Sequence, residues 1–153
     1  MSIHNEIVLS ADPKGHFIEG ILAAGQTPKP GTMLSIISDD TWEVWNGAAD
    51  GEQDEVVILL DDHLRGKTID DAYVAGEHFF AYIPSPGDVV KVLCHNVTGT
   101  PDAFAIGDKL IIMDGLGKCI VTTGTVEMEP FKVIETVAAI TADTLVMCRC
   151  TGN

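Results

Sequence analysis

The stretch HFFAYIPSPGDVVKVL, residues 78–93, decides the fold class. It holds two apolar runs, 78–83 and 89–93, and each has the length of a β-strand in a globular protein. Between them lies Pro84-Ser85-Pro86-Gly87-Asp88, in which the prolines exclude a helix and the glycine favours a turn. The stretch therefore predicts two strands joined by a short turn.

The same pattern extends over most of the chain. Turn sequences such as Asn46-Gly47 and Asp114-Gly115-Leu116-Gly117 separate further short apolar runs. The runs do not alternate with amphipathic helices, which disfavours an α/β fold. The spacing predicts a mainly β protein with a small β-barrel or β-tulip-like domain. Only 67–75 and 135–140 are predicted as helical turns. The further apolar runs are 33–37, 42–45, 56–60, 109–113, 119–123, 131–137 and 144–150.

The N-terminal part differs from the rest in its glycine and proline content. We predict an extended N-terminal arm over 1–31 and a barrel domain over 32–153. The arm contains one candidate strand, 17–23, while Thr27-Pro28-Lys29-Pro30-Gly31 must be extended or turning because its two prolines exclude a helix.

A short motif of glycine followed by an acidic residue precedes three of the apolar runs. It occurs as Gly76-Glu77, Gly87-Asp88 and Gly107-Asp108. Glycine can take the left-handed conformation that ends a loop, and the acid can accept a hydrogen bond from a nearby amide. The motif predicts three structural turns.

Composition limits the classes of partner. The 153 residues are enough for one domain with a sizeable core. They include 23 acidic and 9 basic side chains, and the formal net charge of −14 repels phosphate backbones and anionic lipids. Nucleic acid and membranes are not expected as partners. The start MSIHNE lacks the parts of a signal peptide, so we expect the chain to stay in the cytosol of the cell that makes it.

The four cysteines are expected to be reduced and to pack as small apolar side chains. They are Cys94, Cys119, Cys148 and Cys150. In an extended segment over 144–150, Cys148 and Cys150 point to the same face, which predicts burial in the core in preference to zinc binding. No metal site and no cofactor are predicted.

No catalytic residue is predicted, because phosphate-binding loops, nucleophile elbows and zinc-protease motifs are missing from the sequence. Asp61-Asp62-His63 and Asp39-Asp40 follow apolar runs, where solvated turns are expected. Trp42 and Trp45 point to opposite faces of an extended segment. One is expected in the core, and the other is a candidate for a protein interface, where tryptophan is enriched.

The order of these pieces resembles the capsid decoration, or head-stabilising, proteins of tailed bacteriophages. The resemblance covers about residues 17 to 150 and rests on turn motifs and on the closing strands. Its parts are GQTPKPGTM (25–33), YVAGE (73–77), IPSPGD (83–88), IGDKL (106–110), PFKVIE (130–135) and LVMCR (145–149).

The resemblance implies a β-barrel or β-tulip protein made in the host cytoplasm and placed on the outer capsid surface of the virion. It implies a homotrimer that binds the major capsid protein and stabilises contacts between capsid subunits. The arm would add a strand to a capsid edge, with Ile3, Ile7, Leu9 and Phe17 as apolar anchors. The stretch 42–60 is longer than a minimal barrel needs, and no role follows for it.

Two alternatives stay open from the sequence. The first is a carbohydrate-binding or adhesion module, which exposure of both Trp42 and Trp45 in one groove would favour. The second is a small β-barrel enzyme, for which Asp61, Asp62 and His63 form the one credible cluster; a buried His63 bonded to a carboxylate in a cleft would favour it.

Overall fold

The structure, a computed structural model, describes residues 6–46, 55–96, 102–122 and 129–152. Within these ranges the chain forms twelve strands and one short 3-10 helix, η1 (His63–Arg65). The prediction of a mainly β fold is therefore confirmed. The described part contains no helix with the length and apolar character needed to cross a membrane.

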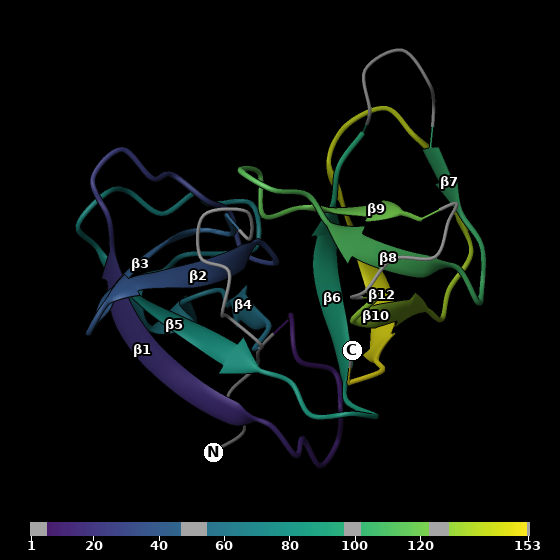
Figure 1. Ribbon diagram of the computed structural model, residues 1–153, viewed down its shortest axis with the longest axis horizontal. Coiled ribbons are helices and arrows are strands. Elements are labelled where there is room, and N and C mark those ends of the chain that lie inside the picture. The colour runs from purple at the N-terminus through teal and green to yellow at the C-terminus, as the bar shows by residue number, and fades with distance from the viewer. Residues whose placement is uncertain (1–5, 47–54, 97–101, 123–128, 153) are drawn as a thin grey trace.

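Five strands close into a first barrel, on the left in Figure 1. Their order around the barrel is β1-β3-β2-β4-β5, and β1 pairs antiparallel with β5 to close it. The contact between β1 and β3 is parallel. The strands are β1 (His16–Leu22), β2 (Met33–Ser38), β3 (Thr41–Val44), β4 (Val57–Leu59) and β5 (His78–Ile83).

Five later strands close into a second barrel, on the right in Figure 1. Their order is β6-β9-β8-β10-β12, and β12 pairs antiparallel with β6. These strands are β6 (Val89–Cys94), β8 (Lys109–Ile112), β9 (Cys119–Val121), β10 (Phe131–Val133) and β12 (Thr144–Cys150). The remaining two, β7 (Asp102–Phe104) and β11 (Val137–Ile140), pair with each other in a small separate sheet.

The two barrels repeat one connectivity. Counted along the chain, the strands of each barrel follow one another around it in the order first, third, second, fourth, fifth. In each barrel the parallel contact joins the first strand to the third, β1 to β3 and β6 to β9. The chain therefore folds the same five-stranded pattern twice.

The three predicted glycine–acid turns are confirmed. Gly76, Gly87 and Gly107 have φ angles of 78°, 94° and 99°. In each turn the carboxylate that follows accepts a hydrogen bond from the amide three residues earlier, at 2.7 to 2.9 Å. The turns lead directly into β5, β6 and β8. A left-handed glycine and an acidic residue thus begin three of the strands.

The hydrophobic core is continuous across the two barrels. One cluster of buried side chains contains Met33, Ile58 and Tyr82 of the first barrel together with Val92 and Phe131 of the second. A smaller cluster, which includes Leu22, Leu34 and Phe79, fills the remainder of the first barrel. Because side chains of both barrels share one cluster, the barrels form a single packed body.

The structure corrects two predictions from the sequence. Residues 137–140 form a strand, and the short helix lies at His63–Arg65, outside the predicted helical turn 67–75. The two alanines of Val137–Ile140 favour a helix, but pairing with β7 holds the segment extended. The strands also form two barrels where one was expected, with β1 from the predicted arm in the first. No boundary between independently folding units follows from this pairing, so the division at residue 31 stays a prediction.

Backbone hydrogen bonds join the barrels at two glycines. Leu93 N donates to Gly31 O at 2.9 Å, and Met33 N donates to Gly117 O at 2.7 Å. Gly117 has a φ of +59°, and a Cβ atom there would collide with the Met33 carbonyl oxygen and lie 2.8 Å from Thr32 Cγ2. The approach of the two backbones at this point therefore requires glycine.

Gly117→Ala is expected to lower the free energy of unfolding by about 3 kcal/mol, because it adds a steric collision to the cost of a positive φ. Gly25→Ala is the matched control, since Gly25 has a φ of +79° and nothing lies within 4 Å of its Cβ position. It should cost only about 1 kcal/mol. Urea denaturation measures both, and equal losses would contradict the close approach.

Candidate interaction surfaces

The N-terminal segment 7–10 lies against the second barrel, although it leads into the first. Val8 forms an antiparallel bridge with Val90 of β6. Lys91 N donates a hydrogen bond to the Ile7 oxygen at 2.7 Å. In Figure 1 this segment, in purple, passes beside β6. The segment therefore acts as a short additional strand that ties the barrels together.

Asp88 binds the parts of the chain that meet beside this segment. Its carboxylate accepts hydrogen bonds from Lys14 N at 3.0 Å, Gly15 N at 3.1 Å and Ser85 N at 2.9 Å. The Tyr82 hydroxyl donates a fourth, at 2.6 Å. Only 3% of Asp88 is exposed, so these donors replace water around a buried carboxylate.

Hydrogen bonding controls the charge of this carboxylate. Burial alone would raise the pKa of Asp88, but the hydrogen bonds from Lys14, Tyr82, Ser85 and Gly15 outweigh burial and hold the pKa below its ordinary value of 3.8. Asp88 is therefore a negative charge in the folded protein at neutral pH.

The predicted anchors of the N-terminal arm lie in different surroundings. Ile3 falls outside the described residues. Ile7 is fully buried and belongs to the shared core cluster. Leu9 is 39% exposed, and Phe17 is 58% exposed with its ring 4.8 Å from that of Tyr82. Of the described anchors, Leu9 and Phe17 are the ones whose apolar surface reaches solvent.

The two tryptophans pack into different core clusters, as expected for opposite faces of the chain. Trp42 is half-buried and packs edge-on against Phe79, with ring centroids 6.3 Å apart. Trp45 is 5% exposed and lies in the cluster shared by the barrels. The two indoles therefore do not share a groove, which was the arrangement that would favour sugar binding.

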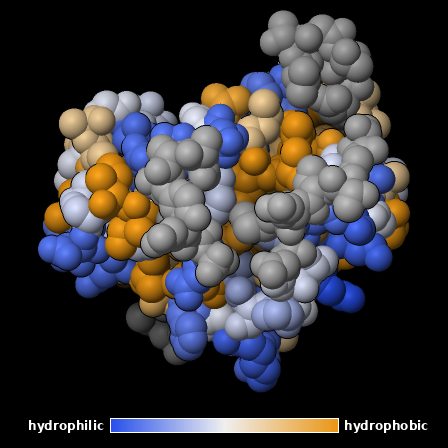
Figure 2. Space-filling model, in the orientation of Figure 1, coloured by the Kyte–Doolittle hydropathy of each residue, from blue (hydrophilic) through white to orange (hydrophobic). Residues whose placement is uncertain are grey.

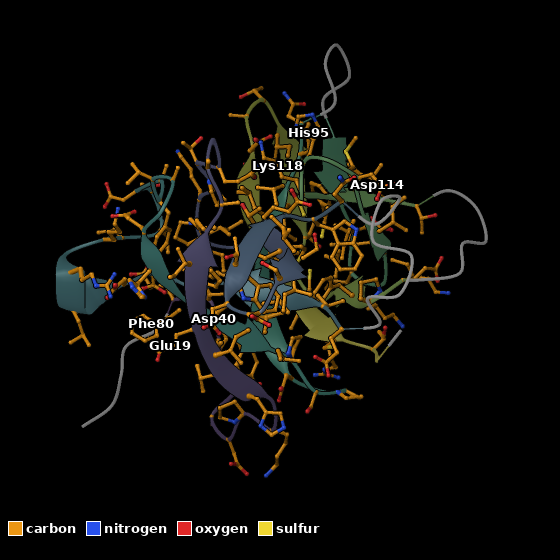
Figure 3. All side chains as sticks on the ribbon, turned by 60° about the vertical axis from the view of Figure 1, so that its left-hand side comes forward. Glu19, Asp40, Phe80, His95, Asp114 and Lys118 are labelled. Carbon is orange, nitrogen blue, oxygen red and sulfur yellow. The ribbon has the colours of Figure 1, made fainter. Side chains whose placement is uncertain are left out.

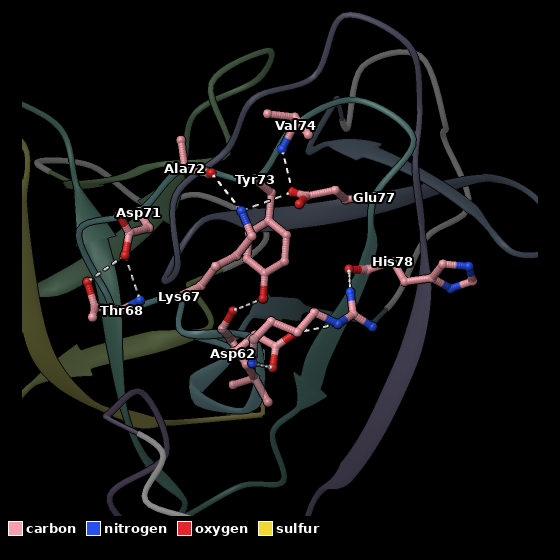
Figure 4. Close-up of polar contacts among 11 residues, drawn as sticks. Asp62, Lys67, Thr68, Asp71, Ala72, Tyr73, Val74, Glu77 and His78 are labelled. Carbon is pink, nitrogen blue, oxygen red and sulfur yellow. Dashed lines mark hydrogen bonds and ion pairs between the residues drawn. The ribbon is translucent and has the colours of Figure 1, made fainter.

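A polar cluster covers one end of the first barrel (Figure 4). Lys67 Nζ lies 3.1 Å from Glu77 Oε2 and 5.1 Å from the centre of the Tyr73 ring. Arg65 Nε lies 3.2 Å from Asp62 Oδ2. The hydrogen bond from the Val74 amide and the nearby Lys67 hold the pKa of Glu77 below its ordinary value. Each charge in this cluster has an opposite charge beside it, which is typical of a structural network.

The cluster considered for an enzyme belongs to the same region. Asp61 and Asp62 are buried, at 5% and 3% exposure, and Asp62 is bonded to Arg65. Both therefore differ from the solvated turn that was expected, because the chain folds back over them at η1. Asp39 and Asp40 are exposed, as predicted. The His63 side chain lies outside the described structure.

The four cysteines are buried free thiols, as their pattern predicted. Val146, Cys148 and Cys150 are buried while Arg149 is exposed, so β12 alternates as expected. Burial raises the pKa of Cys148 to about 12. The described residues contain no group of three or more side chains suited to hold a metal ion.

A groove of about 850 Å³ runs between the two barrels. Residues 25–29 line it from the first barrel, and Lys91, Leu93 and Leu145 line it from the second. In Figure 2 hydrophobic surface, in orange, borders the line where the barrels meet. This groove could not be predicted from the sequence, because its walls come from segments far apart in the chain.

Asp143 organises one wall of the groove. It accepts hydrogen bonds from Lys118 Nζ at 2.6 Å and from Asn96 N at 3.1 Å, and His95 Nδ1 lies 2.9 Å away. Figure 3 shows His95 and Lys118 close to each other on the second barrel. Burial would raise the pKa of Asp143, but Lys118, Asn96 and His95 outweigh it and lower the pKa.

Asp88→Asn is expected to lower the free energy of unfolding by about 3 kcal/mol at pH 7, because an amide cannot accept all four hydrogen bonds. Asp108→Asn, in the equivalent turn before β8, should lower the free energy of unfolding by less than about 1 kcal/mol. Among the described residues, the Asp108 carboxylate accepts one hydrogen bond, from Ala105 N.

The loss at Asp88 should also depend on pH. The pKa of folded Asp88 is below the unfolded value, so its stabilisation is complete above pH 3.8 and is lost as the pH falls through the folded pKa. Urea denaturation from pH 7 to pH 2 should therefore show wild type and Asp88→Asn converging in acid. A difference that stays constant over this range would contradict a buried, ionised Asp88.

The similarity of this chain to known proteins is one of structure and not of sequence. No protein-family model matches the sequence, and no curated protein matches it. Among solved structures, the chain is similar to the crystal structure of the N base of head fiber gp8.5 in bacteriophage phi29. The TM-score is 0.52 at 11% sequence identity, over 90% of this chain and 97% of that chain. The protein therefore shares its fold with a phage head-fiber base over nearly its whole length.

Proposed function

We propose that this protein is a structural component of a phage virion, which binds the outer surface of the head and stabilises contacts between major capsid subunits. The observation that carries the proposal is the shared fold with the phi29 head-fiber base, over 97% of that chain. The sequence motifs that resemble capsid decoration proteins support the same class of function. The proposal includes a homotrimer on the capsid and no enzymatic role.

The physical properties of the chain agree with a task of this kind. The two barrels share one core cluster, so a load applied to one is transmitted to the other. The net charge of −14 disfavours binding to nucleic acid. Some charged side chains of the described residues form ion pairs within the fold, as at Lys67 and Glu77.

Leu9 and Phe17 are the proposed apolar contacts with the capsid. Both are exposed; Leu9 belongs to the N-terminal segment 7–10, and Phe17 lies in β1, into which that segment leads. Ile7 and Trp45 are buried in the core cluster, so their proposed part is to support the fold behind an interface. Phenylalanine is among the residues enriched at protein interfaces, and Leu9 would add to the apolar contact area.

Binding to the head is tested by sedimentation. Purified protein is mixed with expanded heads of the cognate phage that lack it, and the bound amount is measured at increasing concentration. Binding is expected to saturate at a fixed ratio to the major capsid protein. Light scattering is expected to give the mass of a trimer, either for the free protein or for protein released from heads. The absence of saturable binding would refute the proposal.

Leu9→Ser combined with Phe17→Ser should weaken binding to heads about tenfold or more, because it removes apolar contact area at the centre of the proposed surface. Leu64→Ser combined with Ile106→Ser is the control, since these side chains are 87% and 69% exposed and lie elsewhere, in η1 and in the turn before β8. Sedimentation measures occupancy, and circular dichroism verifies that both variants fold. Equal weakening by the two variants would place the contact elsewhere.

A further inference from the structure

The groove between the barrels concentrates positive charge in an acidic protein. It is lined by Lys29, Lys91 and Lys118, and the carboxylates that line it are those of Asp70 and Asp143. Three of the 9 basic side chains of the chain thus meet at this groove, against two of the 23 acidic ones. The groove therefore carries the opposite sign of charge to the molecule as a whole.

Two of these lysines are available to a ligand. Lys118 is held by Asp143 at 2.6 Å. Lys29 and Lys91 form no salt bridge with any other described residue, and Lys29 is exposed. Their ammonium groups are the donors that an incoming carboxylate would meet first.

The walls of the groove suit an extended peptide. Thr27 is exposed in an extended segment, and its backbone N–H and C=O have no hydrogen-bond partner among the described residues. The Thr27 N–H and C=O can form one pair of backbone hydrogen bonds with an added strand. Pro28, which follows, has no N–H, and its oxygen already accepts a hydrogen bond from Tyr73 N. Leu145 and the largely buried Leu93, which are paired on β12 and β6, also line the groove and offer apolar contact to such a strand.

A buried polar atom lines the same groove. Thr32 is 1% exposed, and its hydroxyl oxygen has no hydrogen-bond partner in the described structure. A buried hydroxyl without a partner costs free energy, so a polar group that reaches it on binding would recover that cost. Within the part of the chain that the structure describes, the groove thus combines the unpaired backbone of Thr27, apolar side chains, two lysines without a salt bridge and an unsatisfied hydroxyl. A volume of about 850 Å³ lies within the range of binding clefts.

We propose that the groove between the barrels binds an extended acidic peptide segment of a partner protein, with Lys29 and Lys91 contacting its carboxylates and the Thr27 backbone pairing with it. The identification of that partner as a capsid protein rests on the proposed function. The affinity of the groove for an acidic strand does not depend on the proposed function.

The probe is a fluorescein-labelled peptide of eight residues in which glutamate and valine alternate. Fluorescence anisotropy should show saturable binding that weakens as salt is added, because charge pairs at the surface are screened. Lys29→Glu combined with Lys91→Glu should weaken this binding about tenfold or more. Matched peptides that alternate glutamine or lysine with valine should not bind.

The control variant is Lys132→Glu combined with Arg149→Glu. These two exposed residues face each other on β10 and β12, outside the groove, and their substitution changes the net charge by the same amount. Equal weakening by both variants, or equal binding of a labelled DNA oligonucleotide of the same charge, would show general anion attraction and overturn the proposal. Failure of the acidic peptide to bind wild type would also overturn it.

The same variants separate this inference from the proposed function. If wild type binds the peptide but no heads, the proposed function fails and the groove assignment stands. If the groove variant loses the peptide but saturates heads like wild type, the function stands and the capsid is not the source of the segment. Joint loss of both would identify the groove as a capsid contact.

Discussion

The buried carboxylate of Asp88 lies where three parts of the chain meet, and its hydrogen bonds fix their arrangement. Lys14 and Gly15 belong to the N-terminal segment, Tyr82 to the last strand of the first barrel, and Ser85 to the turn before the second. A charge removed from water needs donors of this number, because each unsatisfied oxygen would cost free energy. The path of the chain between the barrels follows from satisfying this one group.

The barrels are held together by features of small size and strict geometry. Gly31 and Gly117 let two backbones approach until they exchange hydrogen bonds across the boundary. Beneath them Met33 and Tyr82 of the first barrel pack in one cluster with Val92 of the second. Such packing resists relative rotation of the barrels, since any rotation would open voids in a close-packed interior. The groove is therefore a fixed recess in one body.

Much of the fold could be predicted from local sequence, and most of the candidate surfaces could not. The apolar runs around residues 78–93 gave the strands, and the glycine–acid pairs gave three turns, because both signals act within a few residues. Pairing of segment 7–10 with β6 and the division into two barrels depend on contacts between distant residues. Burial of Trp45 and the convergence of Lys29 with Lys91 at one groove likewise require the folded topology.

The attachment of the N-terminal segment to β6 sets an order on folding during synthesis. Ser10 and Val89, which share a hydrogen bond, are 79 positions apart, and Lys14 and Asp88 are 74 apart. The ribosome completes the strands of the first barrel before it makes β6, so the leading segment has no partner strand while those strands emerge. Attachment must await β6, and contacts of such long range make folding slow compared with that of proteins built from local contacts.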